Sequence, residues 1–419
     1  MKSCYTICVG LLCLLLSVVQ PYAQSAILDV ESNKQGVLLP RMTENRRNLI
    51  VDPAHSLIIY QTNNTAGFYY NEGTSGAPAW RRLSTGSSEP CESRIPIDAL
   101  PFTISASGSY YVIADLISGA LEDGIIISVS NVQVDLNGFA ITSGGGAEGN
   151  GIMVTAAVEN ISILNGSIYG WPEDGISAGL ATHSNFTDLH ISSNQDDGLL
   201  VGDQNIIQNC QSRDNGFDGI DTGNNCLVTN CVASDNNDDG IEVGSQSNIK
   251  NCASATNADN GFNAGAGCTM TENTATQNGD RGFVLSNGVV LQNNVSDLNT
   301  GAGFYLGTGC YAQANVSRSN TGHGFTSFQK SFIKENTSTN NSQSGFHTTS
   351  SQVRFEDNHS STNGLHGFNI AALGDCIVIR NTATSNTPSN YAIGAGNSAG
   401  PVVGPDLSTS TNPFSNIGL

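Results

Sequence analysis

The chain has 419 residues, of which 38% are hydrophobic, and a formal net charge of −20. The acidity is uneven: residues 1–94 carry eight Lys/Arg and seven Asp/Glu, whereas residues 95–419 carry eight Lys/Arg and 29 Asp/Glu, a net charge of −21. Such a surface repels DNA, heparin-like chains and anionic lipid, so no nucleic-acid partner is expected. Neutral glycans, cations and cationic partners are compatible with it.

The first 24 residues have the composition of a secretory signal. Lys2 supplies a positive start, Val9–Val19 an apolar core, and Ala23-Gln24-Ser25 a small-residue cleavage region. The apolar run is too short to favour a membrane span. We therefore expect an exported protein, periplasmic, cell-surface or extracellular, with no transmembrane segment in its mature chain.

Residues 25–83 predict a small module, and residues 84–94 a linker. A short helix is expected near Thr43–Ile50. Strands are expected at Leu57–Tyr60, Gly67–Tyr70 and Trp80–Leu83. The segment resembles a module near the start of many exported Bacteroidota proteins, some of them fibre-like. The resemblance implies export and attachment or a homo-oligomer; a folded spacer that covers the first coil is an equally good interpretation.

Twelve glycines recur along the rest of the chain, and from Gly198 to Gly345 every step is 21 residues. Each glycine precedes a large apolar residue. The glycines are Gly124, Gly151, Gly175, Gly198, Gly219, Gly240, Gly261, Gly282, Gly303, Gly324, Gly345 and Gly367. A fixed period of about 20 residues with short β-type segments is typical of a solenoid, and it is too short for two packed helices. We predict an all-β, right-handed parallel β-helix of about 12 coils over residues 95–396, with residues 397–419 packed on it as a tail.

Side chains should alternate within each coil. The first and third residues after the glycine are mostly apolar and the second varies, as in Phe304-Tyr305-Leu306. We expect the first and third to point into the core and the second outward.

A column of asparagines runs in step with the glycines. Its expected members are Asn209, Asn230, Asn251, Asn273, Asn294, Asn315, Asn336, Asn358 and Asn381. We expect these side chains to lie inside and to bond the turns above and below. Asn294 and Asn336 also begin glycosylation sequons, but a stacked inward asparagine is inaccessible to modification.

Eight cysteines follow the signal, an even number that is compatible with disulfides. Cys210, Cys231 and Cys252 occupy one stacked column, in which parallel Cβ vectors stay near 4.8 Å, wider than the ~3.8 Å of a disulfide. Buried thiols that pack as small hydrophobic groups are therefore favoured over disulfides.

The opening segment, the Asp-Gly-Ile repeats and the ending Asn412–Asn416 resemble a family of bacterial right-handed β-helix repeat proteins. The resemblance covers residues 95–419. It implies the fold shared by pectin lyases, polygalacturonases, alginate epimerases and phage tailspikes, and it says little about activity.

Carboxylates gather immediately before the glycines. Between Glu173 and Glu242 there are 13 Asp/Glu and one Lys/Arg, Arg213. Like charges one coil apart repel by about 1 kcal/mol in water and more near a protein surface, so the column needs an explanation. Turn chemistry is one explanation, because Asp and Asn before Gly favour tight turns.

Two functional explanations compete with turn chemistry. The first is a Ca²⁺ site. Its candidate ligands are Asp196, Asp197, Asp218, Asp221, Asp238 and Asp239. The second is acid–base catalysis on a polysaccharide. The candidate catalytic residues are Asp197, Asp218, Asp238 and Asp239.

Polygalacturonase motifs are only partly matched. Asp238-Asp239 and Gly322-His323-Gly324 resemble two of them, but His323 lies four coils past Asp239, ~19 Å at the strand spacing. No Arg or Lys accompanies Ser344-Gly345. We expect His323 and His366 to be exposed turn residues and Arg281 a surface residue paired with Asp280.

Few aromatic residues are expected to face outward. The candidates are Tyr169, Trp171, Phe217 and Tyr305. The preferred hypothesis is an exported β-helix scaffold that binds carbohydrate, with or without Ca²⁺, and has no catalytic activity. The alternatives are a polysaccharide hydrolase or lyase and a fibre or adhesin subunit.

Overall fold

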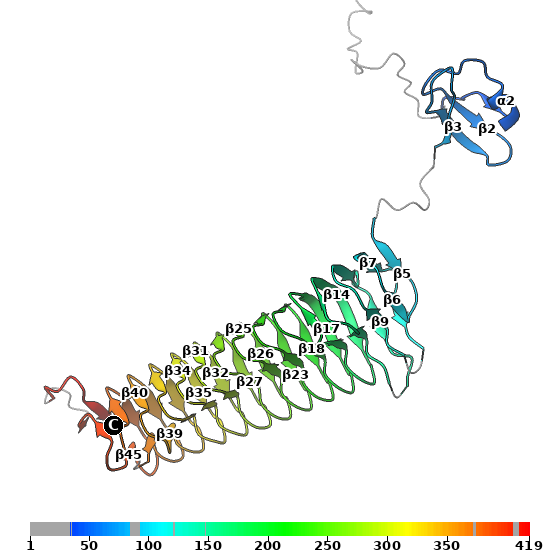
Figure 1. Cartoon of the computed structure of the whole chain (residues 1–419). Coiled ribbons are helices and arrows are strands. Elements are labelled where there is room, and N and C mark those ends of the chain that lie inside the picture. Colours follow the sequence, from blue (N-terminus) through cyan, green and yellow to red (C-terminus); the bar gives the residue numbers. More distant parts are fainter. Residues whose placement is uncertain are drawn as a thin grey trace, which may run out of the picture. The chain divides into compact units, whose positions relative to one another are not determined.

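A computed structural model describes residues 34, 36–83, 93–119, 122–146, 148–371, 374–404 and 410–419 (Figure 1). The chain divides into two compact units, residues 1–92 and 93–419. The predicted signal (residues 1–24), most of the predicted linker (residues 84–94) and Cys91 lie outside the described residues. Within the described ranges, no helix has the length and apolar character needed to cross a membrane.

The N-terminal unit is a four-stranded sheet in the order β1-β2-β3-β4 with one short helix, α2. The elements are β1 (Arg41–Met42), α2 (Glu44–Asn48), β2 (Ile58–Gln61), β3 (Gly67–Asn71) and β4 (Trp80–Arg82). These elements overlap the predicted helix and strands. Thr43 caps the helix, as its hydroxyl accepts the Arg46 N–H.

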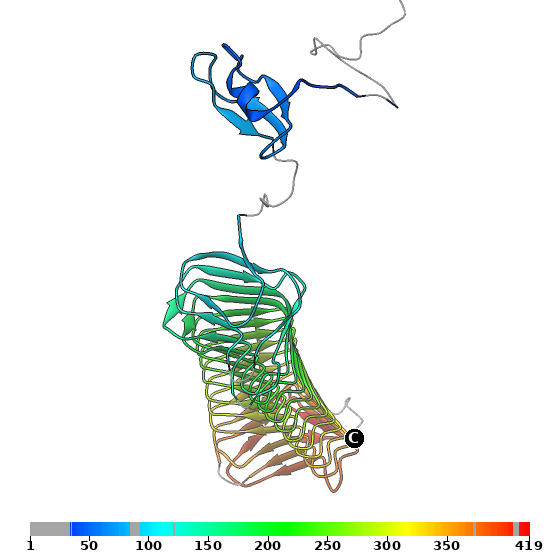
Figure 2. The same ribbon diagram turned by 90° about the vertical axis from the view of Figure 1, so that its right-hand side faces the viewer.

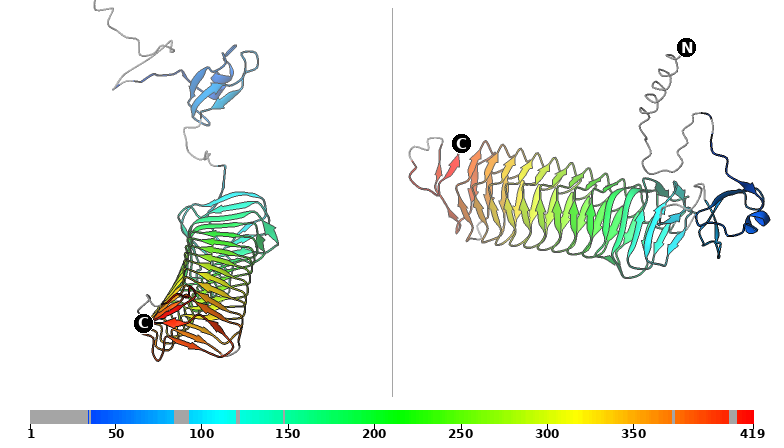
Figure 3. Two further views of the ribbon diagram at one scale, coloured as in Figure 1. Left: turned by 90° about the vertical axis from the view of Figure 1, so that its left-hand side faces the viewer. Right: turned by 90° about the horizontal axis from the view of Figure 1, so that it is seen from above.

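The C-terminal unit is a parallel β-helix in which each regular coil contributes three strands (Figures 2 and 3). The strand that follows each glycine belongs to a 14-stranded parallel sheet. Its strands are β6 (Phe102–Ile104), β9 (Ile125–Ile127), β12 (Ile152–Val154), β15 (Ile176–Ala178), β18 (Leu199–Val201), β21 (Ile220–Thr222), β24 (Ile241–Val243), β27 (Phe262–Ala264), β30 (Phe283–Leu285), β33 (Phe304–Leu306), β36 (Phe325–Ser327), β39 (Phe346–Thr348), β42 (Phe368–Ile370) and β45 (Tyr391–Ile393).

The other strands of each coil form two parallel ladders that the long strands β14 and β17 join into a 28-stranded sheet. Its strands are β5 (Ile95–Ile97), β7 (Gly108–Val112), β8 (Leu116–Ile117), β10 (Val132–Asp135), β11 (Ala140–Thr142), β14 (Ile161–Tyr169), β17 (Asn185–Ser192), β19 (Ile206–Gln208), β20 (Gln211–Arg213), β22 (Leu227–Thr229), β23 (Val232–Ser234), β25 (Asn248–Lys250), β26 (Ala253–Ala255), β28 (Thr269–Thr271), β29 (Thr274–Thr276), β31 (Val290–Gln292), β32 (Val295–Asp297), β34 (Tyr311–Gln313), β35 (Val316–Arg318), β37 (Phe332–Lys334), β38 (Thr337–Thr339), β40 (Arg354–Glu356), β41 (His359–Ser361), β43 (Ile377–Ile379), β44 (Thr382–Thr384), β46 (Ser398–Ala399), β47 (Val402–Val403) and β48 (Asn416–Gly418). A two-stranded sheet pairs β13 (Val158–Glu159) with β16 (Ala181–Thr182).

The described coils outnumber the 12 glycines, because the first and last strands of the 14-stranded sheet follow other residues. Pro101 precedes β6 and Asn390 precedes β45. β45 is the last strand of the sheet, so no following coil packs against Asn390 as Gly261 packs against Gly240.

Tight corners between the strands explain the short period. In the coil of β21, Asn225, Asn230 and Asp235 adopt φ values of 58°, 56° and 59°. Asn and Asp tolerate this left-handed backbone better than most residues, which accounts for their abundance between the strands.

The glycines before the strands are required by packing, not by backbone angle. A Cβ on Gly240 would lie 2.0 Å from Ser254 Oγ and 2.9 Å from the carbonyl oxygen of Gly261 on the next coil. Any larger residue would therefore separate the coils.

The predicted alternation of buried and outward residues is confirmed. In β33, Phe304 and Leu306 are 0% exposed and Tyr305 between them is half-buried. Successive core rings stack in parallel from Phe262 to Tyr391, with centroids 4.7–5.2 Å apart. In-register pairing of identical positions imposes this stack.

The predicted asparagine column is correct from Asn273 onward and wrong before it. Asn273 and Asn294 are 0% exposed, and the amide of Asn273 donates to Asn294 Oδ1 (3.0 Å). Asn209, Asn230 and Asn251 are exposed corner residues instead, with positive φ. The step of 22 residues from Asn251 to Asn273, where the period is 21, marks this change of position.

A second buried asparagine ladder was not predicted. It lies five residues before the first residue of each strand of the 14-stranded sheet from β18 to β45 and runs through Asn194, Asn215, Asn236, Asn257, Asn278, Asn299, Asn320, Asn341, Asn363 and Asn386. Asn236 is typical: its backbone N–H and its side-chain amide both donate to Asn257 Oδ1, at 3.1 and 2.9 Å. Each side chain thus satisfies a corner of the neighbouring coil.

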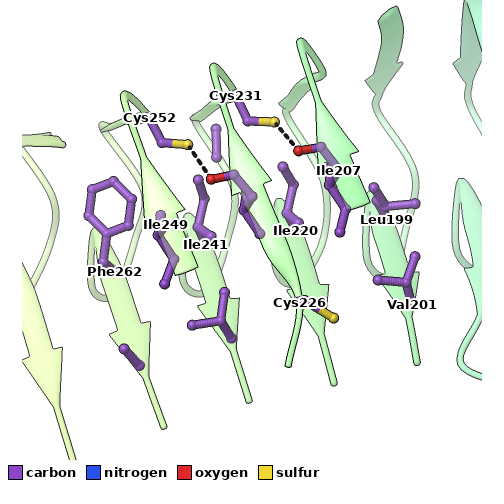
Figure 4. Close-up of a cluster of buried hydrophobic side chains, with 14 of the residues drawn as sticks. Leu199, Val201, Ile207, Ile220, Cys226, Cys231, Ile241, Ile249, Cys252 and Phe262 are labelled. Carbon is purple, nitrogen blue, oxygen red and sulfur yellow. Dashed lines mark hydrogen bonds between the residues drawn. The ribbon is translucent and has the colours of Figure 1, made fainter. Parts of the chain in front are cut away.

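Cysteines replace asparagine in the first buried column. The thiols of Cys231 and Cys252 donate to backbone carbonyls of the preceding coil, at 3.7 and 3.6 Å (Figure 4). The amide of Asn273 makes the equivalent bond to the Ile249 carbonyl at 3.0 Å. All seven described cysteines are buried and free, so the thiols act as small, weakly polar core groups.

This packing predicts thiol chemistry directly. We expect the seven described cysteines of the native protein to resist a thiol reagent, because burial excludes the reagent and raises the pKa of thiols such as Cys268. After denaturation without reductant, all eight cysteines that follow the signal should react. An intact mass that shows three or four disulfides would contradict this account.

Candidate functional site on the outer face of the 14-stranded sheet

The outer face of the 14-stranded sheet carries two rows of side chains. One row is the residue immediately before each glycine, and the other is the second residue after it. The rows meet on neighbouring coils at a sequence spacing of 24 residues: the Arg281 guanidinium lies 4.4 Å from the ring centroid of Tyr305. Asp218 and Glu242 have the same spacing, with carboxylate oxygens within 4.8 Å.

The row before the glycines forms a hydrogen-bonded ladder. The N–H of Asp218 donates to Asp197 Oδ1 (2.9 Å), and the N–H of Asp239 donates to Asp218 Oδ1 (2.8 Å). The N–H of Asn260 continues the ladder by donating to Asp239 Oδ1 (2.8 Å). Each carboxylate therefore satisfies a turn of the next coil, which confirms a turn role for these residues and occupies one oxygen of each.

These carboxylates are withdrawn from water without basic partners. Asp174, Asp218 and Asp239 are 6%, 9% and 4% exposed, and within the described residues none of them forms an ion pair. Burial, reinforced by neighbouring carboxylates, raises the pKa of Asp174 to about 6 and that of Asp197 to about 7. Burial and the charges of Asp197 and Asp239 raise the pKa of Asp218 to about 8.

Three groups, two of which share Asp239, bring carboxylate oxygens within 4.8 Å of one another. The groups are Asp174 with Asp196 and Asp197, Asp218 with Asp239 and Glu242, and Asp238 with Asp239 and Asp259. These eight residues and Asp221 are called the acidic patch below.

The predicted site residues thus lie on one face but in separate groups. Asp197 and Asp218 share no group, whereas Asp218 and Asp239 do. Asp221 lies in the second row, where its charge raises the pKa values of Asp197 and Glu242, both of which are raised mainly by burial. The prediction omitted Asp174, Glu242 and Asp259; the 24-residue spacing from Asp218 would have identified Glu242.

An exposed aromatic ring interrupts the acidic patch. Phe217 is 53% exposed. Its N–H donates to the Asp196 carbonyl, and its carbonyl accepts the Asp238 N–H, both at 3.3 Å. Phe217 therefore lies between Asp196 and Asp238 on consecutive coils, an apolar surface with hydrogen-bond acceptors on both sides.

The other aromatic candidates differ from expectation in part. Tyr169 is 42% exposed, as predicted, but Trp171 is 0% exposed because its indole fills the core beside Gly124. Tyr305 faces outward but is half-buried beneath Arg281. Phe217 is therefore the aromatic surface that the acidic patch offers.

His323 and His366 are half-buried, so the expectation of exposed turn residues is wrong. His323 Nδ1 accepts the Ser344 N–H (3.1 Å), which continues the ladder and leaves the proton on Nε2. Its ring stacks on His347 with centroids 4.2 Å apart. Burial, with the adjacent His347, lowers the pKa of His323 to about 4, so this histidine has a structural role.

A hollow lies at the N-terminal end of the same face. It is lined by Pro101, Glu122, Asp123, Ile126, Glu148, Gly149, Asn150, Met153 and Glu173. Asn150 spans two of these carboxylates, as its amide donates to Asp123 (3.0 Å) and to Glu173 (2.8 Å). The acidic surface therefore continues beyond the acidic patch.

Two family models match the chain. Residues 174–321 match a right handed beta helix region, and residues 19–96 match a phage tail like trimerisation region. The chain has the right-handed parallel β-helix fold of pectin lyase-like proteins, and its N-terminal part is similar to phage-tail-like trimerisation regions. The second match gives the N-terminal module a more definite assignment than its sequence resemblance did. No curated protein matches the sequence.

Several solved structures share the fold. The A-module of mannuronan C-5 epimerase AlgE4 from Azotobacter vinelandii is 16% identical, with 70% of this chain and 91% of that module covered and a TM-score of 0.52. Pectate lyase Pel9A is 14% identical, with 70% of each chain covered and a TM-score of 0.35. The Dettilon tailspike protein is 12% identical, with 72% of this chain and 62% of the tailspike covered and a TM-score of 0.36. At 16% identity, the likeness to the AlgE4 module establishes the fold alone.

Proposed function

We propose that this is an exported, homotrimeric carbohydrate-binding β-helix whose glycan site is Phe217 and the surrounding acidic patch. The observation that carries the site is the half-exposed Phe217 ring between Asp196 and Asp238. Sugars bind proteins through an apolar ring face and hydroxyl groups, and this surface offers a ring and several acceptors. The AlgE4 module, a mannuronan C-5 epimerase and thus a protein with a polysaccharide substrate, supports the choice of ligand class.

Charge narrows the ligand class. The nine carboxylates of the acidic patch form no ion pair in the described residues, so neutral or cationic glycans fit better than anionic ones. Each group of three carboxylates supplies fewer than the six to eight oxygens that Ca²⁺ takes. We propose that Ca²⁺ binds at the acidic patch and that sugar hydroxyls complete its coordination.

Substitution of Phe217 tests the glycan site. We expect Phe217→Ala to weaken binding to the best ligand of a neutral polysaccharide panel at least tenfold, on the order of 1.4 kcal/mol, because the ring face is lost. The matched control is Leu365→Ala, which removes an apolar side chain of 41% exposure from the same column of the β-helix. Equal affinities for wild type and Phe217→Ala, measured by calorimetry, would reject Phe217 as the platform.

Catalysis is the second candidate function, and one observation favours it. Asp218, whose pKa burial raises to about 8, shares a group with Asp239 and Glu242. A carboxylic acid that keeps its proton at neutral pH among further carboxyl groups can serve as general acid. Release of reducing ends, or ultraviolet absorbance from unsaturated products, would establish a hydrolase or a lyase, and its loss in Asp218→Asn would assign the acid.

A further inference from the structure

The N-terminal unit carries several exposed large hydrophobic side chains. Seven of the 20 exposed large hydrophobic side chains in the described residues lie between residues 37 and 83. They are Val37, Leu38, Leu49, Val51, Ile58, Phe68 and Leu83. Concentrated apolar exposure of this kind marks an interaction surface.

One side of the four-stranded sheet is buried at its centre, on β2 and β3. Ile59 and Gln61 on β2 are each 1% exposed, and Tyr69 on β3 is 9% exposed. Arg47 of α2 closes this side: its guanidinium lies 4.7 Å from the Tyr69 ring centroid and donates to Gln61 Oε1 at 2.6 Å. The interior of this unit therefore lies on the α2 side of the sheet (Figure 1).

The other side of the same sheet has no such cover from the described residues of its unit. Ile58 is 39% and Phe68 38% exposed, and Tyr60 and Tyr70 are half-exposed. Tyr60 pairs directly with Phe68, and Ile58 with Tyr70, so the four side chains form one continuous surface. The Tyr60 and Phe68 rings meet edge to face, with centroids 5.1 Å apart. We call these four residues the open sheet face.

Arginines flank the open sheet face. Arg41 pairs with Tyr60 across β1 and β2, and its guanidinium lies 5.8 Å from the Tyr60 ring centroid. Arg81 pairs with Tyr70 across β3 and β4 and forms an ion pair with Glu72 at 2.8 Å. An aromatic centre with an arginine rim has the composition of an interface between protein subunits.

We infer that the open sheet face is the contact through which three copies of this chain associate. The inference rests on the trimer of the proposed function, and it adds the surface and the residues. The match to a trimerisation region spans residues 19–96 and contains the whole sheet, which identifies a second and a third copy of this chain as the occupants. Burial of Ile58, Tyr60, Phe68 and Tyr70 against the same residues of the partners removes apolar area that would otherwise face water.

Sedimentation of the full chain tests the inference. Wild type should have three times the chain mass of 43.7 kDa. Ile58→Ser with Phe68→Ser should raise the dissociation constant of the trimer at least 100-fold and yield monomer at micromolar concentration. The matched control, Leu49→Ser with Val51→Ser, removes side chains of 77% and 84% exposure outside the sheet and should leave the trimer intact. Near-ultraviolet circular dichroism, which reports the packing of Tyr69 and Trp80 beside Arg47, verifies that both variants fold.

A photo-crosslinking residue provides a second readout that does not depend on weakening the trimer. Placed at position 68, it should yield covalent dimers and trimers of the chain, and placed at position 49, none. A monomeric wild type would reject both the trimer of the proposed function and this inference. If wild type is a trimer, two results would reject the open sheet face as the contact and leave the trimer itself standing. One is an Ile58→Ser/Phe68→Ser variant that stays trimeric. The other is crosslinking from position 49 and not from position 68.

Discussion

Replacement of Phe304 by alanine should lower the free energy of unfolding by about 3–5 kcal/mol, the cost of a large cavity in a buried core. Phe304 is 0% exposed, and its ring stacks between Phe283 and Phe325 with both centroid distances at 4.7 Å. The coils on either side hold the backbone in register, so the site can collapse only in part. Thermal and denaturant unfolding of the β-helix measure the loss.

Tyr305→Ala is the matched control for Phe304→Ala. Tyr305 is the next residue and also aromatic, but it is half-buried on the outer face, against Arg281. Its removal should cost about 1 kcal/mol, because it loses a surface contact and leaves no internal cavity. Equal losses at the two positions would show that the strand is in the opposite register.

The acidic patch should make stability fall as pH rises. Burial raises the pKa of Asp197 to about 7 and that of Asp218 to about 8, from 3.8. A carboxyl group with a raised pKa binds its proton more tightly when folded. The resulting stabilisation is complete below about pH 4 and is lost as pH rises through 7 and 8.

Asparagine at two positions should remove this effect. Between pH 5 and pH 8 in a chelating buffer, the free energy of unfolding of wild type should fall by on the order of 2 kcal/mol more than that of the double variant Asp218→Asn with Asp239→Asn. Asparagine preserves the ladder, as Asn150 Oδ1 already accepts the Asp174 N–H in the same row. The control variant Asp214→Asn changes an exposed residue outside the acidic patch, so its stability should depend on pH as that of wild type does. Parallel pH profiles for wild type and the double variant would contradict the expected effect.

If the proposed cation site exists, Ca²⁺ should restore the free energy of unfolding that wild type loses at pH 8. A ligand at a hundredfold excess over its dissociation constant stabilises the folded state by about 2.7 kcal/mol. The comparison requires fixed ionic strength, because screening alone reduces carboxylate repulsion, and Mg²⁺ as a control cation. A shift that is specific for Ca²⁺ in wild type and absent from Asp218→Asn with Asp239→Asn would support the site. A Ca²⁺ shift that equals the Mg²⁺ shift in wild type, or that is the same in wild type and in the double variant, would reject it.

The fold was predictable because one period governs the chain. A glycine every 21 residues, an apolar residue after it and an alternating strand determine the 14-stranded sheet and its register. The end strands β6 and β45 were not predicted as coils because Pro101 and Asn390 stand where the other strands have glycine. The misplaced asparagines show a different limit: corner and core positions are adjacent in sequence, so Asn230 and Asn273 look equivalent although one is exposed and the other buried.

For the candidate site, the sequence predicted a row of carboxylates on successive coils but not which of them lie close together. Sequence spacing placed Asp218 and Asp239 on consecutive coils, and the structure brings them together. Diagonal contacts, such as Asp218 with Glu242, depend on how far neighbouring strands are offset. The sequence also did not predict which carboxylates are buried. Asp239 has the sequence context of an ordinary turn residue, yet it is 4% exposed. Trp171 was expected to face outward but is buried. Its indole can point into the core because Gly124, which lies beside it, has no side chain.

The most direct test of the proposed glycan site is a crystal structure of the full chain with Ca²⁺ and the tightest-binding oligosaccharide of the neutral panel. We predict a sugar ring stacked on Phe217, with its hydroxyls directed toward Asp196 and Asp238 or toward a cation held by the acidic patch. An oligosaccharide bound elsewhere on the β-helix, with Phe217 free of contact, would contradict the proposal.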